Sequence, residues 1–474
     1  METSKLLDAV RALEEPEQSR LRQFAASPYF NEQEELIRLL DYILRFGQGF
    51  EGRGLAKENA FQHLFPGMPY EDKRMRYLMS GLNQLVEQFL AAERSRKQEN
   101  HYRLALLEAV SERGLEKAYR QTLRKLESSL AAEPYRGGAF FYHRMRQAET
   151  EERHFQLQRR RKYDESIQFA SDYLDRFYFL QKLKYACIML DRQAILQGSY
   201  ELNIGKEWEA HLRSRAFFDE PIISLYYTIL QALLEEGKES YFRVLRKSLA
   251  DPGPGIPPGD LQDIYLFAIN YCARKIRQGR EDYIGQALQL YLDGIQSEIL
   301  IDNGQLSPWA FTNVVKLALR LRRYHWIEHF IQRYAPALPE AFRENALHYN
   351  LAELYYYTNR FEQAQEHLKQ VAYSDLNYYL GGRVILAKIY YENEEVEPLL
   401  SLLAAFTIFL KRNKLISSDL KQTYLNFCDI LFQIVKGKRR HWKKLGKKIQ
   451  ETRLLTDREW LQSVYKEASL VLGI

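Results

Sequence analysis

Apolar residues recur along almost the whole chain at intervals of three and four positions, the spacing that places side chains on one face of an α-helix. Segment 70–92 shows this clearly, with apolar residues at positions 75, 78, 82, 85, 86 and 89. Strict alternation of apolar and polar residues, which indicates strands, is nearly missing. The 14 prolines fall mostly between the periodic segments, where they stop helices. The pattern predicts an all-α fold.

The pair Asn303-Gly304 is the one exception to consider, because Asn-Gly is a common turn of β-hairpins. Here the pair lies between two helical patterns rather than between two alternating ones. We therefore expect it to connect two helices.

Changes in the pattern divide the chain into four parts. Residues 1–92 form an N-terminal helical domain, and residues 93–162 form charged amphipathic helices. Residues 163–410 form helical repeats, and residues 411–474 form basic C-terminal helices that cap them. The order of short helices, glycine-rich connection and long helix in the first part would also fit a winged-helix variant without its wing.

The third part contains helix pairs that recur every 34 to 40 residues, which is typical of an α-solenoid. Its clearest unit is 345–371, which resembles the tetratricopeptide repeat (TPR) family. The matching positions are Leu351, Ala352, Tyr355, Arg360, Phe361, Ala364, Leu368 and Val371. Weaker copies place Val314 and Leu386 where this unit has Leu351, so the spacings are 37 and 35 residues.

The resemblance implies antiparallel helix hairpins that stack into a TPR-like superhelix with a concave groove. In this arrangement Ala352 and Ala364 leave room for the two helices of a hairpin to approach closely. The groove of such a superhelix would hold a peptide or a partner helix. We therefore expect a non-catalytic scaffold whose partner is a protein or a peptide.

The phase of the repeat selects the residues that would face this groove on the first helix of each hairpin. These partner-binding candidates are Asn313, Lys316, Asn350, Glu353, Tyr356, Tyr357, Lys388 and Tyr391. Tyrosine is unusually frequent, at 33 of 474 residues. Neighbouring tyrosines on a helix point about 100° apart, so a triplet cannot face entirely inward. Tyrosines that pack between adjacent repeats are an equally good explanation of this frequency.

Charge is concentrated near the C-terminus. Residues 411–450 contain twelve Lys or Arg and two acids, a net of +10, whereas the whole chain carries +6, so the remainder is net acidic. A nucleic-acid-binding regulator is therefore the alternative function, using segment 436–450 or the N-terminal helical domain. Its candidate phosphate contacts are Arg439, Arg440, Lys443, Lys444, Lys447 and Lys448.

The same basic segment has a simpler interpretation. Trp442, Leu445 and Ile449 fall on one helical face, so the helix can dock on the repeats and leave its cations in water. An acidic partner or a membrane surface is a third use of these cations.

Signals of enzymatic chemistry are weak. The sequence has no phosphate-binding glycine motif, no nucleophile elbow and no His-Glu-x-x-His pattern, so we expect neither an enzyme nor a cofactor. His325 and His329 are four residues apart and could share a helix face, but no third metal ligand accompanies them. The three cysteines lie more than 80 residues apart, which leaves no support for a disulfide framework or a cysteine zinc site.

The composition, with 46% hydrophobic and 27% charged residues, is that of a core-forming globular chain and excludes a disordered one. The first residues carry charge where a signal peptide needs an apolar core. The longest nearly apolar run, Leu399 to Leu410, has 12 residues, whereas a membrane span needs about 20. We therefore expect no membrane span and a cytoplasmic location.

Overall fold

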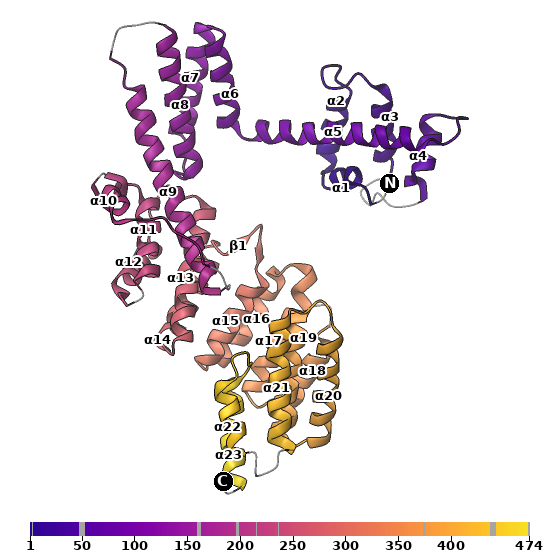
Figure 1. The fold of residues 1–474 in the computed structure, drawn as a ribbon, viewed down its shortest axis with the longest axis vertical. Coiled ribbons are helices and arrows are strands. Elements are labelled where there is room, and N and C mark those ends of the chain that lie inside the picture. Colours follow the sequence, from indigo (N-terminus) through magenta and orange to yellow (C-terminus); the bar gives the residue numbers. More distant parts are fainter. Residues whose placement is uncertain are drawn as a thin grey trace. The chain divides into compact units, whose positions relative to one another are not determined.

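The computed structural model is built almost wholly of α-helices, which confirms the all-α prediction (Figure 1). It describes residues 1, 3–46, 53–158, 163–195, 199–214, 216–235, 237–372, 376–436 and 442–472. The chain divides into two compact units, Met1–Gln181 and Lys182–Ile474, and each is described by itself. Within the described ranges, no helix is both long and apolar enough to cross a membrane.

Two apolar cores lie among the described residues of the first unit. Its helices are α1 (Lys5–Arg11), α2 (Glu15–Ala25), α3 (Glu34–Leu44), a 3-10 turn (Arg53–Leu55), α4 (Lys57–Leu64), α5 (Asp72–Lys97), α6 (Glu99–Glu112), α7 (Glu116–Ala131), α8 (Gly138–Leu157) and α9 (Ser166–Ile195), the last of which continues into the second unit. Helices α1 to α4 pack around α5, and their shared core runs from Leu6 to Phe89. A second, smaller core joins α6 and α7.

The second unit continues the helical chain. Its elements are α10 (Lys206–Ser214), a 3-10 turn (Ala216–Asp219), α11 (Pro221–Leu234), α12 (Glu239–Ala250), α13 (Pro258–Arg277), α14 (Asp282–Gln296), β1 (Ile301–Asp302), β2 (Gln305–Leu306), α15 (Pro308–Arg320), α16 (Tyr324–Tyr334), a 3-10 turn (Ala335–Ala337), α17 (Glu340–Tyr357), α18 (Phe361–Gln370), α19 (Leu376–Glu392), α20 (Val396–Arg412), α21 (Ser418–Lys436), α22 (Trp442–Glu451) and α23 (Arg458–Leu472). Proline opens α11, α13 and α15, where a missing amide proton costs no helical hydrogen bond.

Successive helices from α15 to α20 form three hairpins joined by the same turn. A residue in the left-handed conformation follows the first helix of each hairpin: Arg322 (φ 55°), Asn359 (φ 56°) and Glu394 (φ 59°). The next amide then bonds back to the first helix, from Arg323 to Ala318, from Arg360 to Tyr355 and from Glu395 to Tyr390. This is the Schellman motif. Its three copies are 37 and 35 residues apart, the spacings of the sequence repeat.

The first helices of these hairpins pack side by side, with α17 between α15 and α19. Buried hydrogen bonds tie them together: the Asn350 amide donates to Thr312 Oγ1 (3.2 Å), which lies 3.2 Å from the Tyr378 hydroxyl. Each first helix also packs against the second helix of its own hairpin. Ala352 and Ala364 are fully buried, as their proposed role in close helix contact requires.

The interpretation of Asn303-Gly304 was wrong in one respect. The pair does connect α14 to α15, but it does so as the turn of a two-stranded hairpin, in which Ile301 pairs with Leu306 and Asp302 with Gln305. Both turn residues have positive φ, 49° and 76°, as a tight hairpin turn requires. The strands are too short to show alternation in the sequence, so only the turn signal was visible.

Helices α19 to α23 share one apolar core at the C-terminal end. Trp442, Leu445 and Ile449 are buried in it, which confirms that α22 has an apolar docking face. The indole nitrogen of Trp442 donates to Ser469 on α23, and its ring stacks on Tyr465. Leu399–Leu410, the longest apolar run, lies within α20.

Candidate binding surface

The structure places the eight partner-binding candidates on the first helices α15, α17 and α19, at different depths. Asn313, Lys316 and Tyr357 are exposed; Glu353, Tyr356 and Tyr391 are half-buried; Asn350 and Lys388 are buried. We call the surface that these positions follow the first-helix surface. Its exposed members lie on α15 and α17, and its buried members need a separate explanation.

Asn350 is fully buried and is held inside the helix layer. Besides Thr312, its amide group donates to the carbonyl of Ala346, one turn earlier on α17 (2.7 Å). Its side-chain oxygen has no hydrogen-bond partner within the described ranges. Asn350 therefore orders the first helices and offers no side-chain atom to a partner.

Lys388 is covered by the chain's own C-terminal segment. Its ammonium lies 2.6 Å from a carboxylate oxygen of Asp457, in the connection before α23, and its side chain is only 6% exposed. The ammonium also lies over the rings of Tyr356 (4.8 Å) and Trp460 (5.5 Å), which stabilise a cation through their electron-rich faces. Lys388 is therefore fully engaged within the protein.

Trp460 extends this cover along α19. Its indole nitrogen donates to Glu392 (3.0 Å), and its ring meets Tyr391 edge-on, with centroids 5.6 Å apart. The hydroxyl of Tyr356 lies 3.5 Å from the same Glu392 carboxylate. The C-terminal half of α19 is thus occupied by Asp457 and Trp460, and we call these two residues the C-terminal cover.

Glu353 lies on α17 between two lysines. Burial raises the pKa of its carboxyl group, Lys316 and Lys388 lower it, and Asp457 adds a smaller upward contribution. One carboxylate oxygen, Oε2, is buried without a hydrogen-bond partner among the described residues. That oxygen is enclosed by the protein, so a partner cannot reach it.

Tyr357 remains the most accessible of the candidate tyrosines. Its side chain is 46% exposed at the end of α17. Burial of the ring, with the nearby Glu353 charge, raises the pKa of its hydroxyl to about 12, so the hydroxyl is protonated and can donate a hydrogen bond. Asn313 is exposed on α15 and donates to the Tyr291 hydroxyl (3.0 Å).

Sequence reasoning missed one prominent residue of this surface, Trp309. It is 62% exposed near the start of α15. Trp309, Asn313, Lys316 and Arg320 follow each other at intervals of four, three and four, so they share one helical face, and all four are exposed. We call these four residues the α15 row. The four-residue spacing between Trp309 and Asn313 could have identified Trp309 from the sequence. The TPR-like pattern, however, was aligned on Val314, and Trp309 lies before the matched positions.

The six candidate phosphate contacts have different environments. Lys448 pairs with Asp429, and Lys447 lies 3.6 Å from Glu451. Lys443 and Lys444 are exposed on α22, and no described acid pairs with them. Arg439 and Arg440 lie outside the described residues. Of the six candidates, Lys443 and Lys444 are therefore the two that are described and unpaired.

The chemistry around the histidines gives no metal centre in the described part of the chain. His325 and His329 lie exposed on α16, and no described group of three His, Cys, Asp or Glu residues is arranged to hold an ion. The cysteines, Cys187, Cys272 and Cys428, are all buried as free thiols. Burial raises the pKa of each thiol, so each stays protonated and unreactive.

Comparison with known proteins adds no assignment: no family model, curated protein or solved structure matches this chain. The case for a function therefore depends on the surface itself.

Proposed function

We propose that this chain is a non-catalytic scaffold of the TPR-like solenoid type, which binds a peptide or a protein along the first helices α15 and α17. The repeated hairpins with identical Schellman turns support the solenoid. The resemblance of 345–371 to TPR units supports the same assignment. Each new hairpin adds a first helix beside the previous one, so the outer surface of these helices forms a continuous platform.

The observation that carries the proposal is the exposed α15 row. A tryptophan that is 62% exposed is unusual on a surface, because its large apolar ring gains free energy when it is removed from water. Tryptophan and tyrosine contribute most of the binding free energy at many interfaces. Trp309 lies on the same face as an amide, Asn313, and two cations, Lys316 and Arg320.

These side chains define the chemistry of the partner. Trp309 and Tyr357 would contact apolar or aromatic side chains, while Lys316 would pair with an acidic side chain or a carbonyl oxygen. An extended or helical peptide with an apolar anchor and at least one acidic residue fits this set.

The test is a selection of random peptides on the full-length chain, followed by affinity measurements on variants. Trp309→Ala and Tyr357→Ala should each weaken the selected peptides by about tenfold or more, which is the loss expected when an interface anchor is truncated. The matched control is Phe432→Ala on α21, whose ring is 48% exposed on a different helix. Peptides that bind both variants as tightly as the parent chain would show that the proposal is wrong.

A further inference from the structure

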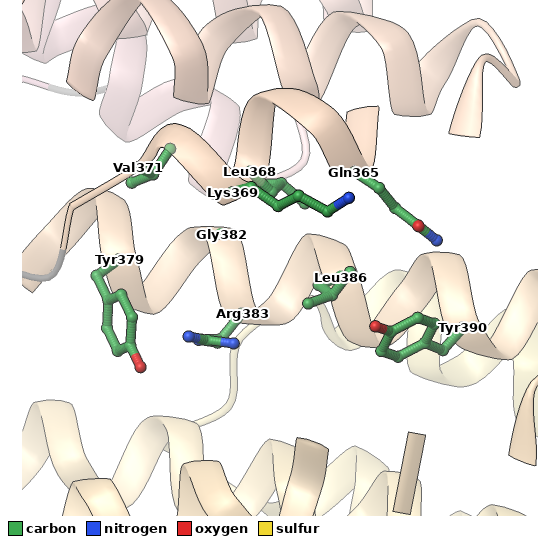
Figure 2. Close-up of a pocket in the computed structure, with 9 residues that line it drawn as sticks. All are labelled: Gln365, Leu368, Lys369, Val371, Tyr379, Gly382, Arg383, Leu386 and Tyr390. Carbon is green, nitrogen blue, oxygen red and sulfur yellow. The ribbon is translucent and has the colours of Figure 1, made fainter. Parts of the chain in front are cut away.

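A pocket lies between α18 and α19, away from the α15 row (Figure 2). Its volume is about 250 Å³, enough for a small molecule or for one chemical group of a larger one. Nine residues line it: Gln365, Leu368, Lys369, Val371, Tyr379, Gly382, Arg383, Leu386 and Tyr390. Figure 2 shows α18 contributing Gln365 and Lys369 on one side and α19 contributing Tyr379, Arg383 and Tyr390 on the other.

Two cations face this pocket without an acidic partner. No described carboxylate lies within ion-pair distance of Lys369 or Arg383, although ion pairs are frequent elsewhere in the protein. The guanidinium of Arg383 lies 4.6 Å from the centre of the Tyr379 ring, which fixes its position without using its N–H groups. These N–H groups therefore remain free to bind a ligand.

The remaining polar groups of the pocket are also unused. The amide of Gln365 and the hydroxyls of Tyr379 and Tyr390 make no hydrogen bond to any other described residue. Each can donate a hydrogen bond to a ligand oxygen. Together with the two cations they supply five donor side chains and no carboxylate, so the pocket has the wrong charge for a metal ion or an amine.

The base of the pocket is apolar and closely packed. Leu368, Val371 and Leu386 form it, and Gly382 contributes bare backbone. A Cβ atom at Gly382 would lie 3.2 Å from Leu368, so the glycine allows α18 to approach α19 at this point. Arg383 is half-buried, so water screens its charge less than that of the exposed Lys369.

We propose that this pocket binds an anionic group, a phosphoryl or carboxylate, held by Lys369 and Arg383. Arginine matches such groups with two parallel hydrogen bonds, and lysine adds a second positive charge. The anion is either a free small molecule or a group carried by a peptide. This inference does not rest on the peptide-binding function, because it concerns different residues and a different probe.

The experiment measures anion binding to the full-length chain in a chloride buffer. Inorganic phosphate and acetate are titrated separately, with ³¹P line broadening for phosphate and calorimetry for both. We expect saturable binding at one site, and the preferred anion distinguishes a phosphoryl from a carboxylate site. N-acetyl-phosphoserine amide is the third probe: binding comparable to that of phosphate shows that a peptide-borne group fits, and much weaker binding shows that the pocket takes free anions.

The decisive variant is Lys369→Gln/Arg383→Gln, which should weaken binding at least about tenfold. The control, Arg453→Gln/Lys466→Gln, removes the same charge from two exposed residues that do not line the pocket. Leu386→Phe is a second variant, which fills the pocket and keeps both cations. It should also abolish binding, so the proposal remains testable if the double variant unfolds. Equal binding by the parent chain and Leu386→Phe, or no saturable binding of either anion, would overturn the proposal.

Discussion

Replacing Asp457 with asparagine should loosen the C-terminal cover. Asparagine keeps the size of the side chain and tolerates the left-handed backbone that Asp457 adopts at φ 49°. The substitution therefore removes one negative charge and changes little else. Its direct consequence is that Lys388 stays buried without its ion-pair partner, and only the more distant Glu353 carboxylate still attracts it.

The size of the effect follows from the surroundings of the pair. Leaving a fully buried charge unpaired costs about 3–5 kcal/mol. Three features reduce this figure here: the Asp457 side chain is 29% exposed, the rings of Tyr356 and Trp460 still stabilise the ammonium, and the Glu353 carboxylate still attracts it. We expect the opening of α23 to become easier by about 2 kcal/mol.

The suitable measurement is native-state hydrogen exchange of the α23 amides, because a chain of two compact units is not expected to unfold in a single step. A change of about 2 kcal/mol corresponds to exchange about 30-fold faster. Asp429→Asn is the matched control. It breaks the pair with Lys448, in which both side chains are at least 40% exposed, and such surface pairs contribute about 0–1 kcal/mol.

A substitution of the other member of the ion pair tests the same reasoning. Lys388→Met removes the buried charge, places an apolar chain between the two rings and leaves Asp457 with access to water, so it should accelerate exchange less than Asp457→Asn. If Lys388→Met has the larger effect, or if Asp457→Asn leaves α23 exchange unchanged, the reasoning about burial and pairing is wrong.

Three further predictions concern packing and protonation. Ala364→Leu should destabilise the α17–α18 hairpin by about 1–3 kcal/mol, because the site is fully buried and already filled; thermal unfolding followed by circular dichroism measures this. Trp442→Ala should cost about 3–5 kcal/mol and expose α22 to rapid hydrogen exchange, whereas an unchanged rate would show that α22 is held by other contacts. Burial and the adjacent His348, whose Nδ1 is 2.8 Å away, lower the pKa of His367, so its neutral form is favoured in the folded state. The contribution of His367 to the free energy of unfolding is fully present above the unfolded pKa of about 6.5 and is lost as the pH falls below that value. Hydrogen exchange of the α18 amides, measured at one pH above and one pH below about 6.5, should show this loss. His367→Gln should remove this pH dependence.

Much of the helical structure could be predicted because its signals are local. In unit 345–371, the apolar spacing predicted two helices, and the structure has α17 and α18 there, joined through Asn359. Asn359 is a residue type that often adopts positive φ, so the sequence itself favours a turn there. Arg and Glu rarely adopt positive φ, so the sequence does not indicate the equivalent turns at Arg322 and Glu394. There the hydrogen bonds of the Schellman motif and the packing of the following helix impose the conformation.

The depth of the candidate residues could not be predicted, because it depends on distant parts of the chain. The repeat phase placed Lys388 on the first-helix surface, but its partner Asp457 is 69 residues further along. Asn350 is buried through contacts with Thr312, 38 residues earlier. A periodic pattern identifies the face of a helix and contains no information about which distant segment covers that face.

The C-terminal cover also determines where the first-helix surface can attract a partner. Asp457 neutralises Lys388, so among the partner-binding candidates and the α15 row the accessible positive charge belongs to Lys316 and Arg320. Arg320 lies 3.8 Å from Glu281 and is partly compensated, which leaves Lys316 as the strongest attraction for an acidic residue of the ligand. Lys316→Glu should therefore shift the peptides selected by the full-length chain from acidic to basic at one position. Selection that still yields acidic peptides would place the binding surface elsewhere on the protein, since no other exposed side chain of the α15 row supplies an unpaired positive charge in the described structure.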